Sequence, residues 1–188
     1  MTRIIAGEWG GRRLEVPPGI RPMQDRERER LFSILAPRME GAAFLDVFAG
    51  SGAIGLEALS RGARWCTFVE NGHKVLAVLR RNLEALGAAR RARVLPISAF
   101  GLHKSGEPGQ GSVDIAVLAP PFPLLEDEAL RPRLDTLFSY VARQLLAPGG
   151  RLILEHPSRM TPPLLHGTVP PEDTRLTAAS ALSFYASR

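Results

Sequence analysis

The chain has 188 residues, a formal net charge of +5 and 45% hydrophobic residues. This length and apolar content predict one domain with a substantial core and room for a small extension. The sequence contains no run of about 18 apolar residues, which argues against a membrane-spanning helix. Cys66 is the only cysteine, so an internal disulfide and a cysteine-based metal site are excluded, and we expect no bound metal. The N-terminus lacks the apolar core of a signal peptide, and we expect a cytoplasmic protein.

Positive charge is concentrated in the N-terminal half of the sequence. Residues 1–40 carry eight arginines against six acidic residues, and residues 61–93 carry eight basic residues against two acidic ones. A basic surface of this kind favours a polyanionic partner such as RNA or DNA.

The first part of the chain, residues 1–40, is predicted to be an extension of a main domain that spans residues 41–188. Strand-like runs at 2–5 and 12–16 surround a glycine-rich turn, which predicts a hairpin. Residues 25–35 alternate charges and place apolar side chains on one face, which predicts an amphipathic helix.

Strand-like and helix-like patterns alternate after residue 41. This order predicts an α/β domain in which a mostly parallel sheet carries helices on both faces. The predicted strands are 43–48, 65–69, 93–96, 114–118, 151–155, 175–177 and 182–186, and the longer predicted helices are 53–61, 73–86 and 126–146.

The most informative segment is the glycine-rich turn that follows the first of these strands. Residues 46–55 read DVFAGSGAIG, in the order strand, tight turn, helix. Glycines at such a turn let the backbone approach a ligand, and the helix N-terminus offers free N–H groups. Glu70 ends the next strand, where a carboxylate can accept hydrogen bonds from both hydroxyls of a ribose.

Two cofactors fit this pattern. Residues 50–55 match the G-x-G-x-x-G pattern of dinucleotide-binding proteins, which is weak evidence by itself. Asp46 favours the alternative, because a carboxylate before the glycines repels a pyrophosphate and suits a cation. S-adenosylmethionine (SAM) carries a sulfonium, an amino group and a ribose, so Asp46 and Glu70 together favour SAM.

The predicted ligand residues fall at one edge of the sheet. Parallel sheets of this type bind ligands across the carboxyl ends of their strands. Asp46, Glu70, Ser98 and residues 119–122 all follow such strand ends. His156 also follows a strand end, where it either contacts substrate or belongs to the core.

Several motifs together resemble those of the bacterial small-subunit (16S) rRNA guanine-N2 methyltransferase family. The similar segments are Arg3–Gly7 with Gly11–Leu14, Arg21-Pro22 with Asp25–Phe32, residues 46–62 (DVFAGSGAIGLEALSRG), Phe68–Asn71, and Asn82-Leu83 with Leu86-Gly87. The resemblance implies a Rossmann-like class I methyltransferase fold with a seven-stranded sheet and SAM as the cofactor. It also implies cofactor contacts at Asp46, Phe48, Ala49, Gly50, Ser51, Gly52, Glu70, Asn71, Ser98 and Ala99, and a catalytic loop at Ala119, Pro120, Pro121 and Phe122.

Three features, at four positions, depart from the family pattern. Met23 and Gln24 replace two threonines, and Ser98 replaces an acidic residue that contacts the adenine amino group. The catalytic loop begins with Ala119 where the family has Asp or Asn. A guanine amine needs acceptors for its N–H bonds as positive charge develops on nitrogen, and Ala119 offers only its backbone carbonyl.

We expect the extension to bind ribosomal RNA or a small-subunit assembly intermediate. Its candidate contacts are Arg3, Arg12, Arg13, Arg21 and Arg26. Trp9 either stacks on RNA from the hairpin tip or packs the hairpin against the domain. The leading hypothesis is a monomeric enzyme that methylates guanine N2. The alternatives are a methyltransferase for DNA or a small molecule, and a homologue that binds SAM and RNA but has weak or no activity.

Overall fold

The computed structural model describes residues 2–20, 22–164, 169–177 and 179–186. The chain divides into two compact units, Met1–Ser98 and Ala99–Arg188.

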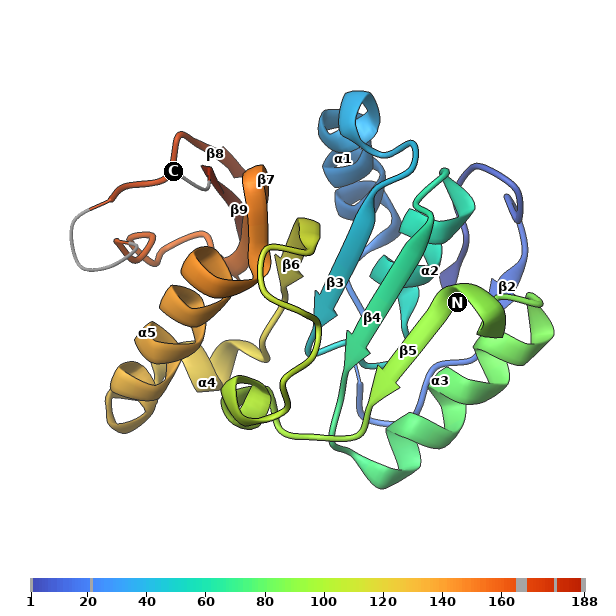
Figure 1. The fold of residues 1–188 in the computed structure, drawn as a ribbon, viewed down its shortest axis with the longest axis horizontal. Helices are drawn as coiled ribbons and strands as arrows, with labels where there is room; N and C mark the ends of the chain where they lie inside the picture. The colour runs from blue at the N-terminus through green and yellow to red at the C-terminus, as the bar shows by residue number, and fades with distance from the viewer. Residues whose placement is uncertain (1, 21, 165–168, 178, 187–188) are drawn as a thin grey trace. The chain divides into compact units, whose positions relative to one another are not determined.

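The first unit begins with a short antiparallel hairpin and continues with alternating helices and strands (Figure 1). Thr2 pairs with Leu14 across the hairpin, so the predicted hairpin is confirmed with shorter strands than expected. The elements are β1 (Thr2–Arg3), β2 (Arg13–Leu14), α1 (Asp25–Leu35), the 3-10 turn η1 (Ala36–Arg38), β3 (Ala43–Val47), α2 (Ala53–Ser60), β4 (Trp65–Val69), α3 (His73–Ala85), the 3-10 turn η2 (Ala89–Arg91) and β5 (Ala92–Leu95).

Close packing of α2 against the sheet explains the third glycine of the sequence motif. β3 and α2 are buried along their whole lengths, as expected for a parallel sheet covered by helices. A Cβ at Gly55 would lie 2.3 Å from the Phe68 ring and 2.6 Å from the Cys66 sulfur. Only glycine therefore lets α2 lie this near to β4.

The second unit contains a further parallel pair of strands and an antiparallel pair. Its elements are the 3-10 helix η3 (Ala99–Lys104), β6 (Val113–Leu118), α4 (Phe122–Glu126), the 3-10 turn η4 (Glu128–Leu130), α5 (Arg131–Tyr140), the π-helical turn η5 (Val141–Leu145), β7 (Leu146–Pro157), β8 (Asp173–Leu176) and β9 (Ser180–Ala186). β6 and β7 are parallel, whereas β9 pairs antiparallel with both β7 and β8.

Two details of the second unit differ from the sequence-based prediction. The helix expected over 126–146 is divided, because the Asp127 carboxylate accepts a hydrogen bond from Ala129 N (2.9 Å) and caps a separate turn before α5. Residues 148–150, expected as a turn, lie within β7, where the register with β6 shifts. A Cβ at Gly150 would lie 2.9–3.2 Å from three carbonyl oxygens, so this irregularity requires glycine.

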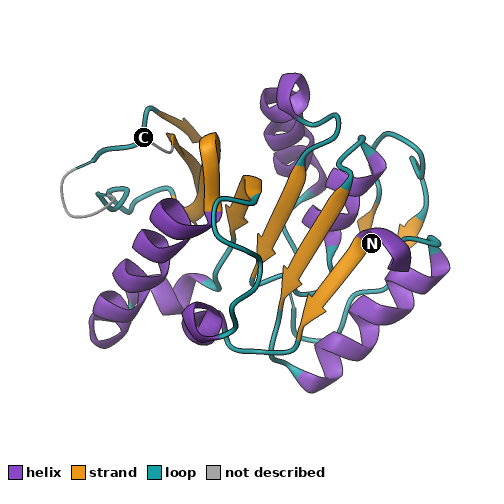
Figure 2. Ribbon diagram, viewed as in Figure 1, coloured by secondary structure: helices purple, strands orange, loops and turns teal. Residues whose placement is uncertain are grey.

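Within the described ranges, seven strands form one sheet in the order β5-β4-β3-β6-β7-β9-β8. In the first unit β3, β4 and β5 lie side by side and point the same way (Figure 2). The predicted α/β class and mostly parallel seven-stranded sheet are confirmed. No helix of the described residues has the length and apolar character needed to cross a membrane.

Candidate active site

The turn after β3 adopts a conformation that few residues tolerate. Phe48 has a φ of 67°, in the left-handed region where a side chain costs on the order of 1–3 kcal/mol. The backbone N–H groups of Phe48 and Ala49 both donate to Val69 O, at 3.1 and 3.0 Å. The end of β4 therefore fixes the start of the turn.

Glu70 holds the next part of the same turn through its carboxylate. Oε2 accepts a hydrogen bond from Gly50 N (3.0 Å), and Oε1 accepts from Asn71 N (2.8 Å) and Gly72 N (2.7 Å). A carboxylate has about four acceptor positions, so Oε2 retains one for a ligand hydroxyl. The half-buried side chain places negative charge at the carboxyl end of β4.

Asp46 lies beneath the turn and is fully buried. Its Oδ2 accepts a hydrogen bond from Gly55 N in α2 (2.9 Å), and its Oδ1 has no partner among the described residues. Burial raises the pKa of Asp46 to about 7; the Gly55 hydrogen bond opposes the rise and the nearby charge of Glu70 adds to it. In this conformation Asp46 fixes α2 relative to β3 and is not exposed.

The first two glycines of the motif have different roles. Gly52 has a φ of +82°, and a Cβ there would lie 2.4 Å from Leu79 Cδ1. Gly50 has a φ of +56°, and its Cβ would meet only Ile20 Cγ2, at 3.8 Å. Gly52 is required by packing inside the unit, whereas Gly50 leaves open space where a ligand can approach the backbone.

These features fit a nucleoside ligand that carries positive charge. Two buried oxygens at the turn, Asp46 Oδ1 and Ser51 Oγ, have no partner among the described residues. Buried polar atoms are normally paired, so the turn offers acceptors that it does not use itself. The carboxylates of Asp46 and Glu70 favour a cation over a pyrophosphate.

The remaining predicted cofactor residues lie at successive places along the chain. Asn71 follows Glu70 and is exposed, and Ser98 is half-buried beyond β5 at the end of the first unit. Ala99 is buried and begins η3 in the second unit. The first unit thus brings together Asp46, Gly50 and Glu70. The ligand contacts of all the predicted residues stay predictions.

The loop predicted to be catalytic lies between β6 and α4 of the second unit. Ala119 and Phe122 are half-buried, Pro120 is buried and Pro121 is exposed. Pro121 O accepts a hydrogen bond from Leu124 N (2.9 Å), and Phe122 is the first residue of α4. Prolines lack an N–H, so the carbonyls of this loop are its principal polar groups.

Two buried side chains of α2 that sequence reasoning missed attach the N-terminal extension. Glu57 accepts hydrogen bonds from Ile5 N (2.7 Å) and Ala6 N (3.1 Å). Ser60 Oγ accepts from Trp9 N (3.0 Å) and donates to Ala6 O (2.6 Å). The signal was present, because a lone carboxylate in the apolar helix 53–60 needs buried partners. The 1–40 boundary stays a prediction, although these contacts make the hairpin part of the first unit.

Arg28 is a third anchor that the sequence did not reveal. Its side chain is fully buried, and its guanidinium donates to Met23 O (3.0 Å), Arg3 O (2.6 Å) and the Asp25 carboxylate (2.9 Å). The arginine therefore ties α1 to β1 and is not available to RNA.

The predicted RNA-binding arginines differ in their surroundings. Arg13 and Arg26 are exposed. Arg12 donates to Ala85 O at the end of α3 (2.8 Å), and Arg3 is 65% exposed and lies 3.7 Å from the Asp25 carboxylate. Arg21 lies outside the described residues.

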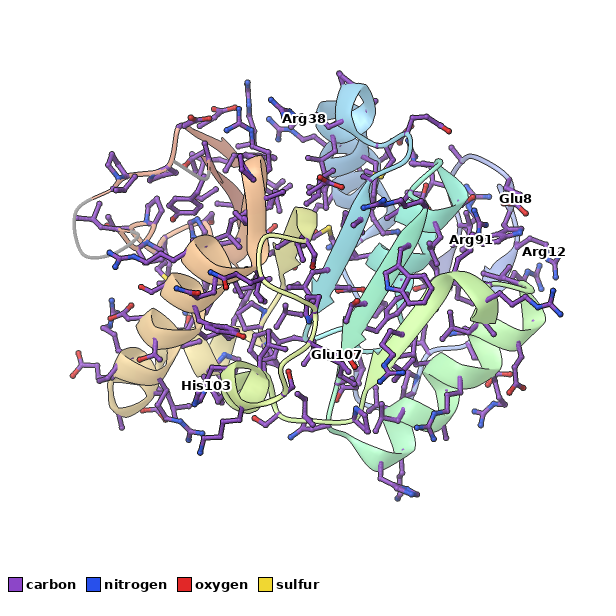
Figure 3. The ribbon with its side chains drawn as sticks, in the orientation of Figure 1. Glu8, Arg12, Arg38, Arg91, His103 and Glu107 are labelled. Atoms are coloured by element: carbon purple, nitrogen blue, oxygen red, sulfur yellow. The ribbon has the colours of Figure 1, made fainter. Side chains whose placement is uncertain are left out.

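Trp9 belongs to the packing of the hairpin. It is 7% exposed, and the Arg91 guanidinium lies 4.9 Å above its ring while pairing with Glu8 at 2.7 Å. Figure 3 shows Glu8, Arg12 and Arg91 on the hairpin side of the first unit. The packing interpretation of Trp9 is therefore favoured over stacking on RNA.

His156 belongs to the core of the second unit. It is fully buried, and its ring nitrogens contact Pro157 O and Ser183 Oγ, both at 2.9 Å. Burial lowers the pKa of His156. This favours the core interpretation over contact with substrate.

Comparison with known sequences gives one family. The family described as conserved hypothetical protein 95 matches residues 2–186. Ribosomal RNA small subunit methyltransferase D of Escherichia coli K12 is 48% identical over 123 residues, which cover 64% of this chain and 60% of that protein. The protein of the same name in Haemophilus influenzae is 42% identical over 124 residues, 64% of each. The aligned part therefore spans about 60% of the length of such relatives.

Comparison with solved structures extends over nearly the whole chain. The Escherichia coli protein yhhF aligns with a TM-score of 0.81 and 34% identity, over 99% of this chain and 97% of that one. A hypothetical protein of Thermus thermophilus aligns with a TM-score of 0.78 and 31% identity, over 98% of each. An RNA methyltransferase of Salinibacter ruber in complex with S-adenosyl-L-homocysteine shares the fold, with a TM-score of 0.63 at 17% identity over 89% and 94% of the two chains.

Proposed function

Because the chain belongs to the family of conserved hypothetical protein 95, we propose that it transfers a methyl group from SAM to the N2 amine of a guanine in small-subunit rRNA. The observation that carries the proposal is the turn after β3, where Glu70 binds Gly50 N, Asp46 lies buried beneath the turn, and the approach to Gly50 is open. The names of the relatives supply the substrate class.

Some of the cofactor residues are proposed to contact SAM, and Asp46 is proposed to hold the protein around it. Glu70 is proposed to accept a hydrogen bond from a ribose hydroxyl through its remaining acceptor position. Gly50 lets the ligand reach the turn, and Asn71, Ser98 and Ala99 are proposed to surround the adenine. Asp46 is buried, so we assign it the role of holding α2 and favouring positive charge nearby. When bound, SAM supplies an electrophilic methyl group.

The loop at 119–122 is proposed to present the amine. The backbone carbonyls of Ala119 and Pro120 accept hydrogen bonds from the amine N–H groups and stabilise the positive charge that develops on nitrogen. Phe122 stacks on the target base, which must leave its helix to be reached. The amine must also lie within about 3–3.5 Å of the methyl carbon.

RNA binding is proposed to involve the extension. Arg3, Arg12 and Arg13 belong to the hairpin, and Arg13 and Arg26 are exposed. Arg21 is included from the sequence alone. The proposal includes a monomer that acts in the cytoplasm on rRNA or a small-subunit assembly intermediate.

One observation favours a second function. Ala119 offers no side-chain acceptor, and the loss of one such group costs on the order of 10²–10³ in rate. The second candidate is therefore a homologue that binds SAM and RNA with weak or no transfer.

Nucleoside mass spectrometry of rRNA tests the proposal. We expect small-subunit rRNA from a strain that lacks the gene to lose one N2-methylguanosine, and the natural gene to restore it. An unchanged nucleoside profile would contradict rRNA methylation. Calorimetry with S-adenosylhomocysteine and NAD tests the cofactor separately, and tighter binding of NAD would overturn the SAM assignment.

A further inference from the structure

One buried side chain links the N-terminal extension to residues 48–52, the turn between β3 and α2 that we call the cofactor turn. Asn82, on α3, is 3% exposed. Its Oδ1 accepts a hydrogen bond from Glu15 N (2.9 Å), and its Nδ2 donates both to Glu15 O (3.0 Å) and to Ser51 O (2.9 Å). One amide group therefore joins the extension, α3 and the cofactor turn.

The contacts with Glu15 decide which way this amide points. An amide has a donor end and an acceptor end that differ only in orientation. Glu15 N requires the oxygen and Glu15 O requires an N–H, so the second N–H is directed at Ser51 O. A flipped amide would place Oδ1 against the Ser51 carbonyl, where two acceptors repel each other.

The same segment also approaches the turn directly. Residues 15–20, which we call the 15–20 segment, continue from Glu15 to Ile20, whose Cγ2 lies 3.8 Å from the position of a Gly50 Cβ. Pro17 and Pro18 restrict the backbone between them, and Ile20 N donates to Pro17 O (3.3 Å). The segment is thus linked to the cofactor turn at one end through Asn82 and lies beside Gly50 at the other end through Ile20.

We propose that Asn82 is a positioning residue that makes SAM binding depend on the docking of the 15–20 segment. This inference rests on the proposed function, with SAM at the turn and RNA on the extension. A segment held in place by RNA keeps the Asn82 amide oriented and the turn ready for SAM. By linkage, SAM stabilises the docked segment by the same factor.

Hydrogen exchange on the natural protein tests this coupling. Saturating S-adenosylhomocysteine should slow exchange of the Glu15 amide several-fold. The amide of Gly11, which donates to Ile4 O in the hairpin (2.8 Å), is the internal control and should change much less. Equal exchange at Glu15 with and without a ligand that demonstrably binds would overturn the coupling.

Two variants at one position provide the matched comparison. Glu15→Pro removes the N–H that orients Asn82 together with the Glu15 carboxylate, and we expect ~3- to 10-fold weaker binding of S-adenosylhomocysteine by calorimetry, the value of about one hydrogen bond. Glu15→Gln keeps that N–H and removes the exposed ion pair with Arg81 (2.9 Å), so binding should change less than twofold. Equal affinities for both variants would contradict the inference.

The outcomes separate the two proposals. Absence of S-adenosylhomocysteine binding by the natural protein contradicts the proposed function. Normal binding that is indifferent to Glu15→Pro contradicts only the role of Asn82. If Glu15→Pro does not fold, the exchange measurement on the natural protein decides.

Discussion

The cofactor turn of the first unit and the 119–122 loop of the second unit are held in different ways. In the turn, Glu70, Asp46 and Asn82 bind backbone groups of Gly50, Gly55 and Ser51. The 119–122 loop relies on proline geometry and on a bond from Leu124 N to Pro121 O. Substitutions at the turn should therefore affect folding and binding together, whereas substitutions in the loop should affect mainly the rate.

The largest effect on the free energy of unfolding is expected from the ionisation of Asp46. Because the pKa of Asp46 is raised to about 7 in the folded state, the folded protein binds the proton more tightly than the unfolded chain. Stability from this group is therefore full below pH about 4 and is lost as pH rises to about 7, by roughly 4 kcal/mol at about 1.4 kcal/mol per unit. Asp46→Asn, which keeps an acceptor for Gly55 N, should lack this loss.

Urea unfolding of both proteins at pH 5 and pH 8 measures the difference. We expect the natural protein to lose free energy of unfolding relative to Asp46→Asn between these values. Parallel pH profiles would show that Asp46 is not held in the way described.

A loss of similar or smaller size is expected for Gly52→Ala. The new Cβ would meet Leu79 Cδ1 at 2.4 Å in a left-handed backbone, and strain plus overpacking should cost roughly 2–5 kcal/mol. Gly11→Ala is the control, because Gly11 has a similar φ of +84° with no atom within 4 Å of the added Cβ. It should cost about 1–2 kcal/mol. Equal losses in denaturant unfolding would mean that packing at Gly52 is unimportant.

Substitutions in the 119–122 loop should lower the rate of methyl transfer and leave stability nearly unchanged. Phe122→Ala is expected to lower kcat/KM for RNA by about 5- to 150-fold through lost base stacking, worth ~1–3 kcal/mol. Phe122→Tyr keeps an aromatic ring and should retain most of the rate. Steady-state methyl transfer, with thermal unfolding alongside, checks this pair. A rate loss that merely follows a fall in Tm would remove the contrast between loop and turn.

The smallest effect on folding is expected at the exposed arginines. The double variant Arg12→Gln with Arg13→Gln should change the free energy of unfolding by no more than about 0.5 kcal/mol per site. RNA affinity should fall and the slope of log K against log salt should flatten by about 0.7–0.9 per lost phosphate contact. Filter binding over a series of salt concentrations measures both, and an unchanged slope would exclude the hairpin as the RNA surface.

The sequence predicted the parts of the fold that depend on local pattern. The turn at 46–55, the helix at 25–35 and the strand at 65–69 are as expected, because glycine spacing and apolar periodicity determine them. The divided helix before β7 was missed, since Asp127 begins a cap only when its side chain folds back onto Ala129 N.

The sequence predicted the charged residues of the candidate site, but not the side chains that hold its backbone in place. Asp46 and Glu70 could be predicted because they are acidic residues before and after the glycine-rich turn in the sequence. Glu57, Asn82 and Arg28 act through backbone groups distant in sequence, and no short motif encodes such partners. The choice between packing and RNA stacking for Trp9 depends on Arg91, which lies over the Trp9 ring. Arg91 also binds Glu8, 83 positions away in the sequence, so the sequence alone does not reveal the contact.

Single-turnover transfer from labelled SAM to unmodified small ribosomal subunits tests the central claim most directly. We expect the natural protein to transfer a methyl group to a guanine, and Ala119→Asp to transfer at an equal or higher rate. No transfer by the natural protein, together with clear transfer by Ala119→Asp, would contradict the account and identify a binding protein that has lost its chemistry.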